Sequence, residues 1–119
     1  MTERKGANFM PKMEFLDSLR GENRFWAAER KRLKKGQKGT RNWSAQQRKD
    51  ILNNKVPKLN GDPIEGHHKY NVIDYPQLAD DANNIYPATF MEHFMRWHGG
   101  NYQNDTSGVP INPLFKEEF

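Results

Sequence analysis

The segment Ile64-Glu65-Gly66-His67-His68-Lys69-Tyr70 decides the fold that we expect, because it places two adjacent imidazoles in a short β-prone stretch. The chain has four histidines, and the other two, His93 and His98, fall with this pair inside one window of 32 residues. Histidine is the usual side chain for proton transfer near neutral pH and a common metal ligand. Because the chain has no cysteine, the cluster indicates an imidazole-based hydrolytic site, not a redox site or a cysteine-type zinc finger. The alternative is a chance grouping of solvated surface histidines.

Length and composition indicate one small domain with a thin core. Only 34% of the 119 residues are hydrophobic while 29% are charged, so we expect a loop-rich domain built on its aromatic side chains. A bound metal would help such a core to hold. No run approaches the roughly 18 apolar residues of a membrane span, and residues 1–11 contain no apolar core of a signal peptide. Without cysteines, the composition leaves localisation open.

Charge divides the chain into two halves. Residues 1–60 hold 16 Lys and Arg against 6 Asp and Glu, a net charge of +10, whereas residues 61–119 hold 3 against 9, a net charge of −6. A basic half beside a half with acids and histidines is typical of a protein that binds a polyanion on one part and acts on it with the other. A solvated helix face, or a basic surface for an acidic protein partner, explains the same pattern equally well.

The first helix is expected in the basic half. Residues 1–12 are expected to form a frayed lead-in without chemistry. The helix begins at Met13, is interrupted at Gly21, resumes, and ends in the basic run 30–35 with Gly36 as its C-cap. The cations of this run suit the negative end of a helix dipole as well as they suit contact with phosphate.

The second helix begins at a capping box. Ser44 is a natural N-cap, Gln47 follows three residues later, and Asn53-Asn54 offer a left-handed stop. Trp43 precedes the cap and fits a buried staple better than a platform for a nucleic-acid base. The basic loop 36–42 between the two helices is expected to be mobile.

The histidine pair is expected on a hairpin. Two short antiparallel strands, 56–59 and 64–72, are joined by the turn signal Asn60-Gly61-Asp62-Pro63. Adjacent residues of a strand point to opposite faces. His67 and His68 therefore take different roles, one facing a helix to bind metal and the other facing outward into a groove.

The rest of the acidic half is expected to form a loop, a helix and a tail. Turn-forming residues over 75–87 predict an ordered loop without regular structure. Apolar spacing predicts a helix over 88–97, with Thr89 or a near neighbour as its cap and Gly99-Gly100 as its stop. The tail 101–119 is expected to wrap the surface.

This layout suits phosphodiester hydrolysis. The reaction needs a metal to neutralise the scissile phosphate and a neutral imidazole to take a proton from water. Asn84, in the loop between strand and helix, can hold that imidazole in place by hydrogen bonds across the loop.

Several segments together resemble a known family. The chain resembles the HNH/endonuclease VII superfamily of ββα-metal nucleases, and specifically the Gly-His-His (GHH) toxin domains at the carboxy termini of Rhs/YD-repeat polymorphic toxins. A related, non-catalytic version looks like the carboxy-terminal region of animal teneurins. The segments that carry the match are Glu65-Gly66-His67-His68, Pro76-x-Leu78-Ala79-Asp80, Asn84-Ile85, Glu92-His93, His98-Gly99-Gly100-Asn101, Trp43, Gln47-Arg48 and Phe25-Trp26-Ala27-x-Glu29.

The resemblance implies a role for each histidine. His67 resembles the metal-binding member of the pair, His68 the general base, Asn84 the central Asn of the HNH motif, and His93 its final, metal-binding His. Many members place a further ligand four residues later, where this chain has a tryptophan. His98 lies five residues after His93, and it binds the metal only if the helix end unwinds; otherwise it contacts phosphate. The family implies one divalent ion, Mg²⁺ in most relatives, while an imidazole-rich site suits Zn²⁺, Mn²⁺ or Ni²⁺.

We therefore predict an α+β domain with a ββα-metal core, acting as a DNA endonuclease at the tip of a secreted Rhs-type polypeptide. Such a nuclease acts in the cytoplasm of a target cell, and its producer needs a cognate immunity protein, acidic to match the basic half. The alternatives are a catalytically silent binding module and an RNase. The predicted DNA contacts are Arg96, Lys69, Arg41, Lys38, Lys34 and Lys35. The single domain, 1–119, divides into the lead-in 1–12, a helical basic region 13–55, the metal core 56–100 and the tail 101–119.

Overall fold

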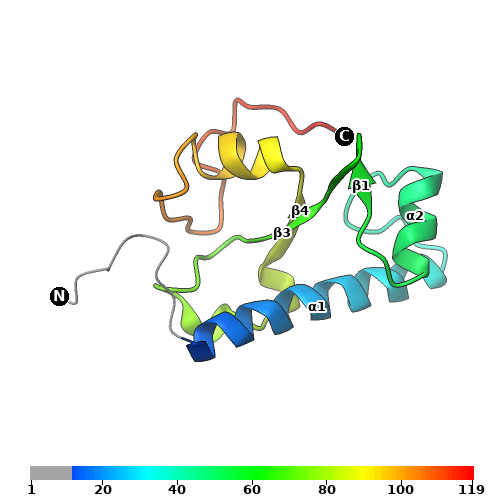
Figure 1. Ribbon diagram of the computed structural model, residues 1–119, viewed down its shortest axis with the longest axis horizontal. Helices are drawn as coiled ribbons and strands as arrows, with labels where there is room; N and C mark the ends of the chain where they lie inside the picture. Colours follow the sequence, from blue (N-terminus) through cyan, green and yellow to red (C-terminus); the bar gives the residue numbers. More distant parts are fainter. Residues whose placement is uncertain (1–11) are drawn as a thin grey trace.

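The computed structural model describes residues 12–119 as helices packed around two small antiparallel sheets, which confirms the α+β class. Helix α1 runs along one side of strands β3 and β4, and the helical segment that contains η3 lies on the other (Figure 1). In chain order the elements are α1 (Lys12–Lys34), α2 (Ala45–Leu52), β1 (Lys58–Leu59), β2 (Asp62–Pro63), β3 (Glu65–His68), the 3₁₀ turns η1 (Pro76–Leu78) and η2 (Ala82–Asn84), β4 (Ile85–Ala88) and the π-helix η3 (Glu92–Trp97).

The first helix is continuous, so the predicted interruption at Gly21 is wrong. The glycine serves close packing: a Cβ built on Gly21 would lie 2.4 Å from the carbonyl oxygen of Ala79. The predicted end at Gly36 is confirmed, because this residue has φ +77° and its N–H donates to the oxygen of Leu33 at 3.0 Å. The expected lead-in lies outside the described residues except for Lys12, which already belongs to α1.

Substitution of Gly21 by alanine should therefore destabilise the protein. Alanine in a helix interior is normally favoured over glycine by about 0.5–1 kcal/mol, but here the new methyl group meets backbone that must move, a change that costs about 1–3 kcal/mol. We expect a lower urea midpoint for Gly21→Ala with an unchanged slope. A higher midpoint than that of the wild type would contradict the close contact of α1 with Ala79.

The second helix begins and ends as predicted. Ser44 Oγ accepts from the N–H of Gln47 at 3.1 Å, and Gln47 Oε1 accepts from the N–H of Ser44 at 2.9 Å. Asn54 takes the left-handed conformation with φ +61°. Trp43 is buried, as predicted, and packs in the core. That core is formed by Leu33, Trp43, Ile51 and Ile64, with Trp26, Leu59 and Phe119 against it.

The strand that carries the histidines has a different partner from the one predicted. Strands β1 and β2 close a hairpin of two residues each around Asn60 and Gly61, whose φ values are +51° and +87°. The following strand, β3, pairs antiparallel with β4, so that His67 lies opposite Tyr86. The prediction that 75–87 has no regular structure, made from its turn-forming residues, is therefore wrong, because the end of this segment forms β4.

Two buried polar groups hold the loops around this framework. Glu29, fully buried on α1, accepts from the N–H of Thr40 and the Nε1–H of Trp43, both at 2.6 Å, and from Arg32 Nε at 2.9 Å. Burial alone would raise the pKa of Glu29, but these hydrogen bonds hold it below its usual value. Loop 36–42, which we expected to be mobile, is therefore anchored to α1.

The second buried group is Arg41, which joins the sheet to the tail. Its guanidinium makes two hydrogen bonds with the carboxylate of Glu92, at 2.6 and 2.9 Å, and donates to the oxygens of Pro87 and Phe119. The tail crosses over the helical segment around η3 (Figure 1). Within residues 12–119, no helix is both long enough and apolar enough to cross a bilayer.

Candidate active site

Strand β3 directs its two histidines to opposite faces, as its alternation predicts. The side chain of His67 is 2% exposed and faces η3, with its ring 4.8 Å from that of His93 and 4.5 Å from that of Trp97. His68 is directed toward the α1 side, where its Nε2 lies 2.9 Å from the oxygen of Ala79. Strand β3 therefore supplies one buried imidazole that faces η3 and a second imidazole that faces Ala79 on the α1 side.

The π-helical turn of η3 brings His93 and His98 onto one face. On an α-helix, residues five apart point about 140° away from each other. Here the N–H of His98 donates to the oxygen of His93 at 3.1 Å, an i→i+5 bond that widens the turn and returns His98 above His93. Their rings lie 4.9 Å apart. His98 thus reaches the cluster without unwinding of the helix end, the only route that we had expected.

Neighbouring acceptors fix the tautomers of these two histidines. His93 Nδ1 lies 2.7 Å from Glu65 Oε1, and His98 Nδ1 lies 2.8 Å from the oxygen of Asn104. A carbonyl oxygen and a carboxylate oxygen both accept hydrogen bonds and cannot donate them. Each Nδ1 therefore carries a hydrogen, and each Nε2 keeps its lone pair. The Nε2 of His67 is buried without a hydrogen-bond partner among the described residues. All three imidazoles thus have a nitrogen free to bind an ion.

The three histidines fit a divalent cation. One ligand nitrogen from each of His67, His93 and His98 lies within 4.8 Å of the other two. A divalent ion held by all three nitrogens would draw them closer together, since bonds from a metal to imidazole nitrogen are about 2.0–2.1 Å long. Burial lowers the pKa of His67 to about 2, with the neighbouring histidines adding to the effect, and burial also lowers the pKa of His93. Both imidazoles are therefore neutral at pH 7, the form that binds metal.

His68 is held as a neutral base. Because the carbonyl of Ala79 accepts, Nε2 of His68 carries the hydrogen and Nδ1 keeps its lone pair. Burial lowers the pKa of His68, and the hydrogen bond to Ala79 offsets part of that effect. Gly21 of α1 packs closely against this carbonyl. The carbonyl that bonds His68 therefore lies between the imidazole and α1.

Asn84 holds the loop around His68 through side-chain hydrogen bonds to backbone groups. Its Nδ2 donates to the oxygens of Tyr70 and Leu78, at 3.0 and 3.2 Å, and its Oδ1 accepts from the N–H of Tyr70 at 2.8 Å. Leu78 immediately precedes Ala79, whose carbonyl bonds His68. The side chain of Asn84 therefore joins the backbone beyond His68 to the residue that precedes its acceptor.

Glu22 is a neighbour of the site that sequence reasoning missed. It lies on α1 against the histidine strand, since a Cβ on Gly66 would be 2.9 Å from its Cγ. Burial, with the nearby charge of Glu65, raises the pKa of Glu22 to about 7. No spacing rule links it to the histidines, because the contact depends on how α1 packs. The place of Glu65 beside the histidines could have been predicted, because it lies two residues before His67 on the same face of the strand.

The raised pKa of Glu22 makes stability depend on pH. Between pH 4.5 and about 7 the folded state binds a proton on Glu22 that the unfolded state has released. The contribution of this proton to the free energy of unfolding is therefore full below pH 4.5 and is lost as the pH rises through about 7. We expect Glu22→Gln, in EDTA, to melt above the wild type at pH 8 and close to it at pH 4.5. Glu14→Gln removes a carboxylate from the first turn of the same helix and should slightly lower the melting temperature at pH 8. Equal melting of Glu22→Gln and wild type at pH 8 would contradict the burial of this charge.

The predicted DNA contacts divide into exposed and internal side chains. Lys34, Lys35 and Lys38 are exposed at the end of α1 and in the loop that follows. Arg41 lies in the interior with both terminal nitrogens bonded, so it is a structural residue and we do not propose it as a DNA contact. Arg96 uses its Nη1 to bond two carbonyl groups of the tail.

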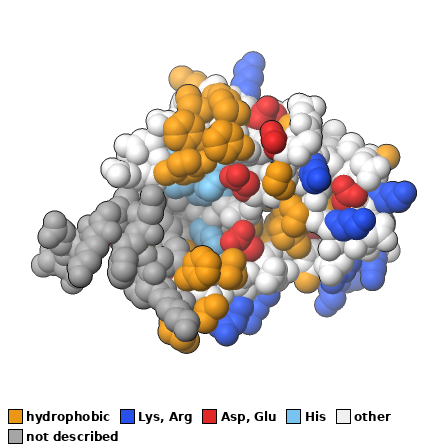
Figure 2. All heavy atoms as spheres, viewed as in Figure 1, with side chains coloured by type: hydrophobic (Ala, Val, Ile, Leu, Met, Phe, Trp, Pro, Cys, Tyr) orange, Lys and Arg blue, Asp and Glu red, His pale blue; other side chains and the backbone are white. Residues whose placement is uncertain are grey.

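One face of the molecule separates histidines from cations. Histidine side chains reach the surface beside acidic side chains and between two groups of hydrophobic ones, while Lys and Arg gather mainly toward the other end (Figure 2). Half-buried Lys69 adjoins the histidine pair in sequence. The predicted separation of a basic part from a histidine part is thus visible on this face.

Comparison with known proteins gives one family match and several matches to teneurins. Residues 17–89 match the family described as GHH-signature-containing HNH/Endo VII superfamily nuclease toxins. The match includes the GHH segment and Asn84, and it ends before His93. The chain is also 37% identical over 62 residues to teneurin-3 and 37% identical over 71 residues to teneurin-4, both of Mus musculus, and 34% identical over 71 residues to teneurin-1 of Gallus gallus.

These matches cover 52%, 60% and 60% of this chain, respectively, and 2% of each teneurin, so the chain corresponds to a small segment of those relatives. The family match spans residues 17–89, which is 73 of the 119 residues, and includes both the helical region and the histidine strand. The chain belongs to the GHH-signature HNH/Endo VII superfamily of nuclease toxins.

Proposed function

We propose that the protein is a metal-dependent DNA endonuclease with a ββα-metal centre made of β3, β4 and η3. The observation that carries this proposal is the set of three imidazoles with free nitrogens, one of them the buried Nε2 of His67, which has no hydrogen-bond partner within residues 12–119. A neutral fourth imidazole, His68, lies on the opposite face of the same strand. Family membership supports phosphodiester hydrolysis as the reaction.

Each group of the site has a role in this reaction. His67, His93 and His98 would hold a divalent ion, which when bound stabilises the charge of the scissile phosphate and of the leaving oxygen. Nδ1 of His68 accepts a proton from the water whose oxygen attacks phosphorus. The bond from phosphorus to the 3′-oxygen breaks, and that oxygen takes a proton from solvent. Asn84 acts as a positioning residue, because it fixes the loop that orients His68.

We also propose the biological setting that the sequence predicted. The domain would be the terminal, toxic part of a secreted Rhs-type polypeptide that acts in the cytoplasm of a target cell. Its exposed lysines after α1 would attract both DNA and an acidic immunity protein. Family membership supports the toxin role. Expression of the wild type inside a bacterial cell should stop growth, whereas expression of His68→Ala should not.

Incubation with supercoiled plasmid tests the enzyme directly. Purified protein should nick plasmid, lose this activity in EDTA, and recover it when one of Mg²⁺, Mn²⁺, Zn²⁺ or Ni²⁺ is restored. A structured RNA incubated in parallel should be cut more slowly. Faster cleavage of the RNA would make the protein an RNase. No cleavage of either polymer with any ion would exclude the enzyme and leave a binding module of the same fold.

A further inference from the structure

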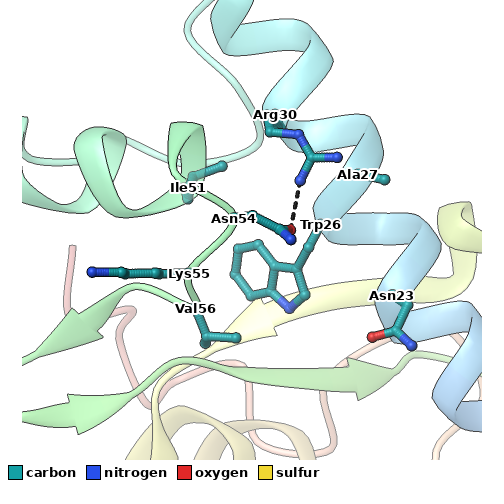
Figure 3. Close-up of a pocket in the computed structure, with 8 residues that line it drawn as sticks. All are labelled: Asn23, Trp26, Ala27, Arg30, Ile51, Asn54, Lys55 and Val56. Atoms are coloured by element: carbon teal, nitrogen blue, oxygen red, sulfur yellow. Dashed lines mark hydrogen bonds between the residues drawn. The ribbon is translucent and has the colours of Figure 1, made fainter.

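A pocket outside the histidine site opens between α1 and the segment that follows α2. Its volume is about 420 Å³, within the range of roughly 300–1,000 Å³ typical of small-ligand sites. Figure 3 shows the indole of Trp26 at its centre, with α1 residues on one side and residues 54–56 on the other. The lining residues that matter for its chemistry are Asn23, Trp26, Ala27, Arg30, Asn54 and Lys55.

The indole of Trp26 provides a fixed aromatic surface. It is half-buried, packs edge-on against Phe25 at 5.0 Å, and lies 6.0 Å from Trp43 in the core. Ala27, the next residue of α1, also lines the pocket. A rigid indole that reaches solvent offers a stacking surface for a planar group, and nucleic-acid bases are such groups.

The polar groups around the indole are donors and cations. Arg30 Nη1 donates to Asn54 Oδ1 at 2.7 Å, which holds the guanidinium at the pocket (Figure 3), and within residues 12–119 its other N–H groups have no partner. Lys55 extends outward from the opposite rim (Figure 3). Within residues 12–119, neither cation makes an ion pair with an acid, and no acid lines the pocket. Asn23 and Asn54 add amide groups that match the edges of bases.

The pocket lies along the same helix, α1, that packs against the histidine strand. Trp26 lies four residues after Glu22, about one turn or 6 Å along the helix axis, and Glu22 packs against Gly66 beside His67. Successive nucleotides of a strand are about 3.4 Å apart along a duplex axis. A strand that runs along α1 from a scissile phosphate at the histidines would therefore reach the pocket within a few nucleotides.

We propose that this pocket binds one unpaired nucleotide of the substrate strand, with its base on Trp26 and its phosphate near Arg30 and Lys55. This inference rests on the proposed nuclease function and adds a substrate preference to it. A base within an intact duplex already stacks on its neighbours, so only an unpaired or displaced base can reach the indole. The protein should then bind single-stranded or locally opened DNA more tightly than closed duplex. A protein partner would need a broader surface than this concave pocket.

Binding in EDTA separates this inference from cleavage. We would measure the Kd of a fluorescein-labelled oligothymidylate, and of a duplex of the same length, for wild type, Trp26→Leu, Arg30→Ala and Lys31→Ala. The last variant removes the same charge from an exposed position on α1 outside the pocket. We expect Trp26→Leu to weaken single-strand binding about 5- to 150-fold. Arg30→Ala should weaken it more than Lys31→Ala does, and duplex binding should change less.

A second readout protects the test if Trp26→Leu folds poorly. In the wild type, the indole N–H resonance of Trp26 should shift as oligothymidylate is added and stay in place when an acidic peptide is added. Equal single-strand affinity of Arg30→Ala and Lys31→Ala, an unmoved Trp26 resonance, or a shift caused by the acidic peptide alone would overturn the inference. If the wild type nicks plasmid but its pocket does not bind the oligonucleotide, the inference fails and the proposed function stands. If the pocket binds the oligonucleotide but the protein cuts no nucleic acid, the proposed function fails and the binding site stands.

Discussion

Replacement of His68 by alanine should lower the rate of plasmid nicking by about 10²- to 10⁴-fold, the range for loss of a general base. Metal binding should remain, because His68 faces Ala79 on the α1 side while His67, His93 and His98 face one another on the other side of the strand. The measurement is the nicking rate at saturating metal, together with the affinity for the ion by calorimetry.

The adjacent residue provides the matched control for this experiment. His67→Ala removes an imidazole from the next position of the same strand and should abolish both metal binding and nicking. Loss of metal binding in His68→Ala would mean that its inactivity reports damage to the metal site. Nicking by His68→Ala at the wild-type rate would remove His68 from the role of base.

Replacement of Arg41 by alanine should destabilise the fold by about 3–5 kcal/mol, because it leaves the carboxylate of Glu92 buried without its cation. The side chains of Arg41 and Glu92 are 2% and 0% exposed and approach to 2.6 Å. The same change removes donors to β4 and to the carbonyl of Phe119. Urea unfolding followed by circular dichroism measures the loss, which is a large share of the roughly 5–15 kcal/mol of a whole domain.

A second ion pair with the same N···O distance, but exposed to solvent, isolates the effect of burial. Arg20 and Asp17 also approach to 2.6 Å, but their side chains are 53% and 33% exposed. Removal of such a surface pair costs about 0–1 kcal/mol. If Arg20→Ala and Arg41→Ala lost the same stability, the buried network around Glu92 would contribute nothing beyond surface electrostatics.

Local signals in the sequence predicted the ends of helices and the opposite faces of the histidine pair. Ser44 with Gln47 is a capping box whose partners are three residues apart, and Gly36 supplies a left-handed C-cap at the end of its own helix. The opposite directions of His67 and His68 follow from strand geometry alone. These features depend on residues that are close in sequence, which is why a pattern reveals them.

The features that sequence reasoning missed depend on contacts between distant segments. Gly21 looked like a helix break, but its role is set by Ala79, 58 positions away. Arg41 looked like a surface cation of a basic loop, yet it pairs with Glu92, 51 positions away. The π-turn that brings His98 to His93 widens a helix whose apolar spacing indicates only an α-helix. Tertiary packing decides each of these outcomes, and one sequence does not encode it in any short pattern.

The central claim is that His67, His93 and His98 hold one catalytic ion. The most direct test counts ions by titration calorimetry, with the ion that supports nicking, in the wild type, His67→Ala and His98→Ala. We predict one ion per chain in the wild type, with loss of both tight binding and nicking in each variant. Variants that bind the ion as the wild type does, or a wild type that nicks DNA without binding any ion, would contradict the three-histidine centre.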